Sequence, residues 1–229
     1  MTSGDSTASK PDQAEPVAPA PPEVVLQRFG AAAADLLVRY AGWLAGPGTV
    51  RGLLGPREVP RLWDRHLLNS AALAELVPPG IRLVDIGTGA GLPGLAVACV
   101  RPDLRVDLVE SMLRRTDFLT EVVADLGLAE RVRVIRGRAE DSSVVNTVGS
   151  AEFVTARAVA PLDRLVRWAF PLLRPAGSLL AVKGATAEDE MTEHQRFLTQ
   201  MRAEVREVIE CGAGLVDPPT RVIHLVRGK

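Results

Sequence analysis

Four glycines within eight residues follow a short apolar segment of the chain, at Gly87, Gly89, Gly91 and Gly94. Glycine lets a ligand approach the backbone closely and adopts positive φ without strain, and Pro93 suits the first turn of a helix. An apolar strand that leads into such a turn and then into a helix predicts a ligand bound over the loop. The spacing Gly-x-Gly-x-x-Gly from Gly89 also matches the dinucleotide fingerprint, so a nicotinamide cofactor stays open at this point.

Glu110, at the end of the next predicted strand, fits that fingerprint, because a carboxylate there can accept hydrogen bonds from ribose hydroxyls. Two details favour a different ligand: Asp85 lies at the tip of the first strand, before the loop, and the spacing Gly87-x-Gly89-x-Gly91 begins directly after that strand. The pattern Asp-x-Gly-x-Gly-x-Gly resembles motif I of class I S-adenosylmethionine (SAM) methyltransferases. This resemblance implies SAM as the cofactor, with Gly87 and Leu92 along its methionine and ribose parts and Asp85 near its ammonium end, through the loop or water. The segment Gly137-Arg138-Ala139-Glu140-Asp141, after the third predicted strand, would flank the adenine. The residues predicted to bind the cofactor are Asp85, Gly87, Gly89, Gly91, Leu92, Glu110, Ala139, Glu140 and Arg157.

The segment after the predicted fourth strand limits the acceptor of the methyl group. It reads Thr155-Ala156-Arg157-Ala158-Val159-Ala160-Pro161 and lacks the Asn/Asp-Pro-Pro-aromatic pattern typical of enzymes that methylate exocyclic amines. Neither Cys99 nor Cys211 stands in the context of a nucleophile for pyrimidine carbon-5 methylation, and Arg157 replaces the Asp that a ribose methylase needs. A ring nitrogen such as guanine N7 is attractive because its lone pair needs no general base.

Five segments, in order and spacing, carry a more specific likeness. They are Arg65-His66-Leu67-Leu68-Asn69-Ser70, the loop Gly-Thr-Gly-Ala-Gly-Leu-Pro-Gly, Glu110-Ser111, Ala156-Arg157-Ala158 and Val182-Lys183-Gly184. Together they resemble the bacterial 16S rRNA guanine-N7 methyltransferase family called RsmG or GidB, from about Val24 onward. The resemblance implies methyl transfer from SAM to N7 of a guanosine in 16S rRNA, within the small ribosomal subunit or its precursor. The segment Gly46 to Leu53 departs from the family's Asn-Leu-Thr pattern, so no RNA contact is carried over to it.

The charged residues of these segments are expected to act by positioning. Arg157, Lys183 and His66 form the predicted catalytic set, and Arg65, His66 and Lys183 are predicted to bind RNA. Attack by N7 makes the guanine cationic, so a positive side chain against N7 would oppose the reaction. We therefore expect Arg157 and Lys183 to orient the guanine O6, loop phosphates or the SAM carboxylate, with no proton abstraction by any of these residues. A basic stripe could bind RNA or be a solvated strand edge; it comprises Arg131, Arg133, Arg136 and Arg138.

The elements that must position these residues alternate between short β-rich segments and helical ones, which predicts an α/β fold with a parallel sheet. The last two strand-like segments are joined only by a Gly/Pro-rich loop, which predicts an antiparallel pair at the sheet edge. The predicted class is the Rossmann-like class I SAM-dependent methyltransferase fold, with a mostly parallel seven-stranded sheet and a C-terminal antiparallel strand. Strands are expected at 82–86, 105–110, 132–136, 153–156, 178–183, 205–211 and 221–227, and helices near 92–100, 112–126 and 162–172.

The N-terminal part divides by composition. Residues 1–22 contain five prolines and no aromatic residue, which predicts a disordered tail. Apolar residues recur at helical spacing from Glu23 to Ala45 and again after Pro56 and Pro60 as far as Leu76. We expect a helical cap over 23–78 and a SAM-binding domain over 79–229.

Composition excludes several classes of function. The chain of 229 residues is 47% hydrophobic, has no apolar segment of membrane-spanning length and no signal-like N-terminus, so we expect a cytoplasmic protein, and a monomer. A net charge of −1 requires any RNA partner to be held by a local patch, and two cysteines with three histidines leave no metal site of ordinary spacing. A SAM methyltransferase acting on a small molecule stays open, although 4% aromatic residues argue against an aromatic lid. A non-catalytic RNA- or nucleotide-binding protein and a dinucleotide oxidoreductase also stay open.

Overall fold

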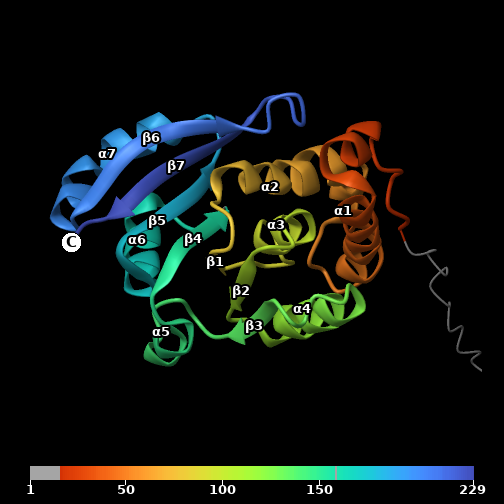
Figure 1. Cartoon of the computed structure of the whole chain (residues 1–229), viewed down its shortest axis with the longest axis horizontal. Coiled ribbons are helices and arrows are strands. Elements are labelled where there is room, and N and C mark those ends of the chain that lie inside the picture. The colour runs from red at the N-terminus through yellow and green to blue at the C-terminus, as the bar shows by residue number, and fades with distance from the viewer. Residues whose placement is uncertain (1–15, 158) are drawn as a thin grey trace, which may run out of the picture.

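A single sheet organises the molecule. The structure, a computed structural model, describes residues 16–157 and 159–229. In these residues seven strands are ordered β3-β2-β1-β4-β5-β7-β6, and β7 runs antiparallel to both of its neighbours while β1 to β5 are parallel (Figure 1). This order confirms the predicted fold class. The strands are β1 Arg82–Ile86, β2 Arg105–Glu110, β3 Val132–Arg136, β4 Ala151–Arg157, β5 Leu173–Lys183, β6 Ala203–Cys211 and β7 Thr220–Arg227.

Helices cover both faces of the sheet, and each face has its own hydrophobic cluster. Successive residues of a strand point to opposite faces, so Leu83 joins one cluster and Val84 the other. None of the described helices combines the length and the apolar run needed to cross a bilayer. The helical elements are α1 Glu23–Trp43, η1 Leu44–Gly48, η2 Pro56–Arg61, η3 Leu62–Leu68, α2 Asn69–Ala71, η4 Ala72–Leu76, α3 Gly94–Val100, α4 Leu113–Asp125, α5 Ser142–Val148, α6 Leu162–Ala169, η5 Phe170–Leu172 and α7 Ala187–Gln200.

The N-terminal cap shares a core with the sheet. Leu37, Tyr40 and Leu44 are fully buried at helical spacing, and they belong to the same cluster as Leu83 of β1 and Phe118 of α4. Burial of each such side chain contributes about 1.5–3 kcal/mol to folding. The cap therefore lies fixed against one face of the sheet, above the first strands (Figure 1).

The described part of the predicted tail is packed on the cap. Pro19 accepts a hydrogen bond from the Trp63 indole at 2.8 Å, and Ala18 packs against the core. These contacts differ from what is expected of a disordered tail, since the extended Pro-rich backbone supplies the acceptor for the indole N–H. The predicted tail's residues 1–15 lie outside the described residues.

The other differences from the predicted elements are local. The helical backbone continues through Gly46-Pro47-Gly48 as η1 instead of stopping there, and α3 begins at Gly94 rather than at Leu92. Strand β5 begins before the Pro175-Ala176-Gly177 segment, whose residues read as a turn. Helices α5 and α7 were not predicted; each contributes few buried residues to the core, and α7 buries only Ala187 and Leu198.

Candidate active site

The glycine loop lies where β1 ends, at the carboxyl edge of the parallel strands. Gly87, Gly89 and Gly91 have φ of 64°, 62° and 106°, a region that side chains with a Cβ disfavour. The backbone N–H of Gly87 donates to the Val109 carbonyl of β2 at 2.9 Å, which ties the start of the loop to the neighbouring strand. The positive φ values agree with the glycine-rich turn that the sequence predicts, and backbone hydrogen bonds hold it.

Asp85 organises this loop from within the core. Its Oδ2 accepts hydrogen bonds from the Thr88 hydroxyl at 2.6 Å and from the Gly94 N–H at 2.7 Å, which joins the two ends of the turn. The carboxyl is fully buried, and burial raises its pKa to about 7 against the opposing effect of these two hydrogen bonds. Asp85 therefore shapes the loop, and any influence on a ligand passes through the loop.

The glycines of the motif differ in what surrounds them. A Cβ on Gly89 would have no neighbour closer than 4.0 Å, whereas a Cβ on Gly91 would lie 2.6 Å from the Tyr40 hydroxyl and 3.0 Å from Leu95. Gly91 is buried, and it lies outside the cleft together with Leu92. Gly91 has no side chain, which lets α1 pack against the loop, and contact of Gly91 and Leu92 with the cofactor stays a prediction.

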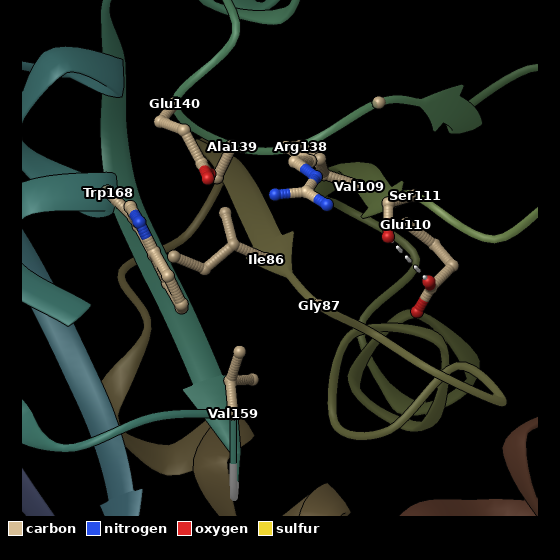
Figure 2. A pocket seen from close by; sticks show the side chains of 11 residues that line it. Ile86, Gly87, Val109, Glu110, Ser111, Arg138, Ala139, Glu140, Val159 and Trp168 are labelled. Carbon is tan, nitrogen blue, oxygen red and sulfur yellow. Dashed lines mark hydrogen bonds between the residues drawn. The ribbon is translucent and has the colours of Figure 1, made fainter. Parts of the chain in front are cut away.

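A cleft of about 220 Å³ opens beside Gly87. Figure 2 shows Trp168, Ile86 and Val159 on one side of it, and Arg138, Ser111 and Glu110 on the other. Four predicted cofactor residues line it, Gly87, Glu110, Ala139 and Glu140, while Asp85 and Gly89 do not. Gly137 and Arg138, from the segment expected to flank the adenine, also line it, whereas sequence reasoning did not assign the cofactor to the remaining lining residues, which are Ile86, Val109, Ser111, Val159 and Trp168.

Glu110 connects the cleft to the loop. Its side chain is buried, and its carboxylate accepts hydrogen bonds from the backbone N–H groups of Gly89 at 3.1 Å and Met112 at 2.9 Å. Arg115 lies 3.3 Å from the same carboxylate. A carboxylate has about four acceptor positions, and the Ser111 hydroxyl takes the fourth at 3.5 Å, a long contact that a hydroxyl donor in the cleft could replace.

The second part of the site lies at the end of β4. The Arg157 guanidinium donates to the Arg65 carbonyl at 3.3 Å and lies 3.4 Å from His66 Nδ1, while His66 Nε2 lies 2.8 Å from a Glu58 carboxylate oxygen. Burial lowers the pKa of His66, and the hydrogen bond from His66 lowers the pKa of Glu58. The structure thus brings together three predicted residues from distant parts of the chain, and adds Glu58, which the sequence analysis did not single out.

Lys183 occupies a different environment from the one predicted. Its ammonium donates to the Ala160 carbonyl at 3.0 Å and pairs with Glu190 at 2.7 Å, and Glu190 also accepts from the Leu162 N–H. Both partners are largely buried. Rather than presenting a free cation, Lys183 holds the loop that contributes Val159 to the cleft.

The basic stripe divides into structural and exposed residues. Arg133 pairs with the buried Asp107 through two hydrogen bonds of 2.7 Å, and Arg131 donates to the Ala98 carbonyl at 2.7 Å. Arg136 and Arg138 are exposed. Across the described ranges, no group of three or more His, Cys, Asp or Glu side chains could hold a metal ion.

Comparison with known proteins identifies the family. Residues 33–218 match the GidB model, described as rRNA small subunit methyltransferase G. The chain belongs to the GidB family. Relatives named ribosomal RNA small subunit methyltransferase G include one from Mycobacterium marinum, 54% identical over 85% of this chain and 84% of that protein. Another, from Streptomyces avermitilis, is 53% identical over 92% of this chain and 87% of that protein.

Solved structures share the fold of this GidB chain. Fibrillarin from Aeropyrum pernix, solved with natively bound S-adenosyl-L-methionine, superposes with a TM-score of 0.54 at 21% identity, over 69% of this chain and 76% of that one. A putative SAM-dependent methyltransferase from Methanococcus maripaludis gives a TM-score of 0.55 at 14% identity, over 70% of this chain and 85% of that one. These likenesses confirm the fold.

GidB membership confirms the predicted family, and with it the class of enzyme, a methyltransferase with SAM as cofactor. The residues of the cleft fit that cofactor. Ile86, Val159 and Trp168 offer apolar surface for a base, and Glu110 offers an acceptor for ribose hydroxyls. Beside them, the open space at Gly89 lets a ligand approach the backbone.

Proposed function

We propose that this GidB chain transfers the methyl group of SAM to N7 of a guanosine in 16S rRNA. One observation carries the proposal: the cofactor cleft and the Arg157 edge adjoin. Val159 stands two residues after Arg157, lines the cleft and lies 2.9 Å from the Cβ position of Gly87. A guanine held at that edge would therefore lie next to the reacting end of the cofactor.

The geometry favours catalysis by positioning. Bound SAM supplies an activated methyl group, and guanine N7 supplies a lone pair, so no proton has to be removed before transfer. His66 is poorly placed as a base because both ring nitrogens face partners, Glu58 on one side and Arg157 on the other. Orientation of nitrogen, methyl and sulfur in line would then supply most of the rate enhancement.

Arg157 and the helical segment beside it are proposed to orient the acceptor. The Arg157 guanidinium would bind the guanine O6, a loop phosphate or the SAM carboxylate, and Arg65, whose side chain is half exposed, would dock the RNA together with His66. We assign Lys183 an indirect part, through the loop that it holds at Ala160. Because the net charge is only −1, these local cations have to carry phosphate recognition.

The proposed substrate is 16S rRNA in the small ribosomal subunit or its precursor, and we propose that the protein acts in the cytoplasm as a monomer. The test is transfer of tritium from labelled SAM to naked 16S rRNA, a precursor particle and the small subunit. Label is expected in at least one of the three, at a site where borohydride and aniline cleave the strand, since that chemistry is specific for 7-methylguanosine.

A matched control uses RNA in which 7-deazaguanosine replaces guanosine, because this base lacks N7. Transfer that persists into the deaza RNA would contradict the proposal. Calorimetry with SAM and with NADH separates the methyltransferase from a dinucleotide oxidoreductase, and label in RNA separates the enzyme from a binding protein.

A further inference from the structure

We call the end of β4 around Arg157, together with Arg65 and His66, the acceptor edge. It also contains a carboxylate, that of Glu58, which has no role in the proposed function. Glu58 lies on η2, and its Oε2 is 2.8 Å from His66 Nε2, eight positions further along the chain. The Glu58 side chain is 31% exposed and that of His66 is 13% exposed. This contact lies at the margin of the core, where a hydrogen bond to a charged group is stronger than on an open surface.

The two neighbours of His66 together select one tautomer. A carboxylate can only accept a hydrogen bond, so Nε2 must carry the proton, and Nδ1 then has a free lone pair. That lone pair faces the Arg157 guanidinium at 3.4 Å, a group that can only donate. The reverse tautomer would place an N–H against the guanidinium and a lone pair against the carboxylate, so it is unfavourable on both sides.

The positive charges around Glu58 indicate a second, electrostatic role for its carboxylate. Arg65 lies 3.5 Å from Glu58 Oε1, and Arg61 also contributes to the positive field at this carboxylate. Arg157 and Arg65 oppose a positive charge on the His66 ring, in addition to the effect of its burial. Glu58 is the anion that keeps a neutral His66 oriented between them.

We propose that Glu58 is a positioning residue, which acts through His66 to hold the Arg157 guanidinium at the end of β4. Arg157 has a further contact to the same segment, at the Arg65 carbonyl, so the guanidinium is held at two points. The inference rests on the proposed function, because holding Arg157 matters for the rate only where an acceptor is oriented at this edge. Glu58 itself need not touch the substrate.

The test compares Glu58→Gln with Asp64→Asn. Both changes remove one negative charge from neighbouring positions, and within the described residues Asp64 makes no side-chain hydrogen bond or ion pair. At saturating SAM and RNA, Glu58→Gln is expected to lower the single-turnover rate about tenfold, the equivalent of one charge-assisted hydrogen bond. The affinity for SAM is expected to stay within about twofold, and Asp64→Asn is expected to match the wild type.

Two further measurements distinguish a positioning role of Glu58 from a merely structural one. Nitrogen-15 spectra of His66 should show the single Nε2-protonated tautomer in the wild type and a mixture in Glu58→Gln, with the His66 signals assigned by their loss in His66→Ala. In the His66→Ala background, Glu58→Gln should change the rate by less than about twofold, because the proposed action passes through the imidazole.

The proposal is overturned if Glu58→Gln keeps the single tautomer, if its rate equals that of Asp64→Asn, or if its only effect is on the KM for RNA. Failure of the proposed function looks different: the wild-type protein would then transfer no methyl group to any RNA. In that event the tautomer spectra alone decide the part of Glu58, since they require no substrate.

Discussion

The two halves of the site are built in opposite ways. The glycine loop is held by backbone hydrogen bonds and by Asp85, whose carboxyl is completely buried. The acceptor edge is held by side chains, with Arg157 and His66 only partly buried and Arg65 half exposed. All residues of the loop are contiguous in sequence, whereas Glu58 and Arg157 are almost one hundred positions apart.

This difference predicts different responses to substitution. In the loop a change should act through volume and φ, so it should alter cofactor affinity or folding. At the acceptor edge a change should act through hydrogen-bond direction, so it should alter the rate of transfer while SAM affinity is preserved. The predictions below test this division, from the largest expected effect to the smallest.

The strongest test of the loop is Gly87→Val. The new Cβ would lie 2.9 Å from both methyl groups of Val159, at a residue whose φ is +64°. Strain of about 1–3 kcal/mol and the displaced Val159 should lower SAM affinity about 100-fold by calorimetry. Gly127→Val is the matched control, since φ there is +68° and nothing lies within 4 Å of its Cβ. Equal SAM affinities in Gly87→Val and the control would place the cofactor elsewhere.

Gly91→Ala should damage folding rather than binding chemistry. Its Cβ would lie 2.6 Å from the Tyr40 hydroxyl, which itself donates to the Ala90 carbonyl at 2.8 Å. The free energy of unfolding should fall by about 2–3 kcal/mol in denaturant titrations. Tyr40→Phe alone should cost about 1 kcal/mol, but combined with Gly91→Ala it should restore part of the loss, because it removes the clashing oxygen. Simple additivity of the two changes would contradict the packing argument.

Asp85→Asn should flatten the pH dependence of stability. Burial raises the pKa of Asp85 from 3.8 to about 7, although Thr88, Gly94 and Arg157 favour the charged form. Between those pH values the folded protein binds more protons at this carboxyl than the unfolded chain does, so the free energy of unfolding falls as pH rises through 7. Relative to Asp85→Asn, the wild type should lose about 1–2 kcal/mol between about pH 6 and pH 8.5. If the free energy of unfolding changed with pH in the same way in both proteins, the pKa of Asp85 in the folded protein would not be raised.

The smallest effect is expected for His66→Gln. Glutamine can donate to Glu58 and accept from Arg157, as the neutral imidazole does, but it does not titrate. The single-turnover rate should therefore stay within about threefold of the wild type and be nearly flat from about pH 6 to pH 8 in both proteins. A wild-type rate that rises tenfold per pH unit below about 6.5, and a loss of that slope in His66→Gln, would make His66 a general base.

The division between the two halves also explains what sequence alone could predict. Strands β1, β2 and β3 were predicted with their observed bounds because Val, Ile and Leu dominate each segment and turn residues bound it. The glycine loop was predicted because its chemistry lies in one short segment. Gly91 shows what the sequence alone could not predict. A glycine that leaves room for a ligand and a glycine that leaves room for Tyr40 cannot be distinguished from the residue type.

The acceptor edge was predicted only in part. His66 and Arg157 were singled out through a family resemblance, yet nothing in the spacing of Glu58 and His66 predicts their contact across a change from a 3-10 to a π-helical turn. For Lys183 the position at a strand end was predicted, but its ion pair depends on Glu190 of α7, a helix that the apolar pattern did not reveal. Partners chosen by tertiary structure leave no local signal.

Because the cap and the sheet share one hydrophobic core, the fold affects whether the protein or the RNA must change shape when the two bind. Because Leu62, Leu67 and Leu68 of η3 are buried in the same cluster as Leu83 of β1, the segment that carries Arg65 cannot swing over the cleft like a lid without opening that core. Deformation on complex formation then falls to the nucleic acid. A guanosine has to leave its stack to bring N7 to the cleft, at a few kcal/mol of unstacking energy, so a strand already unpaired at the target should be the better substrate.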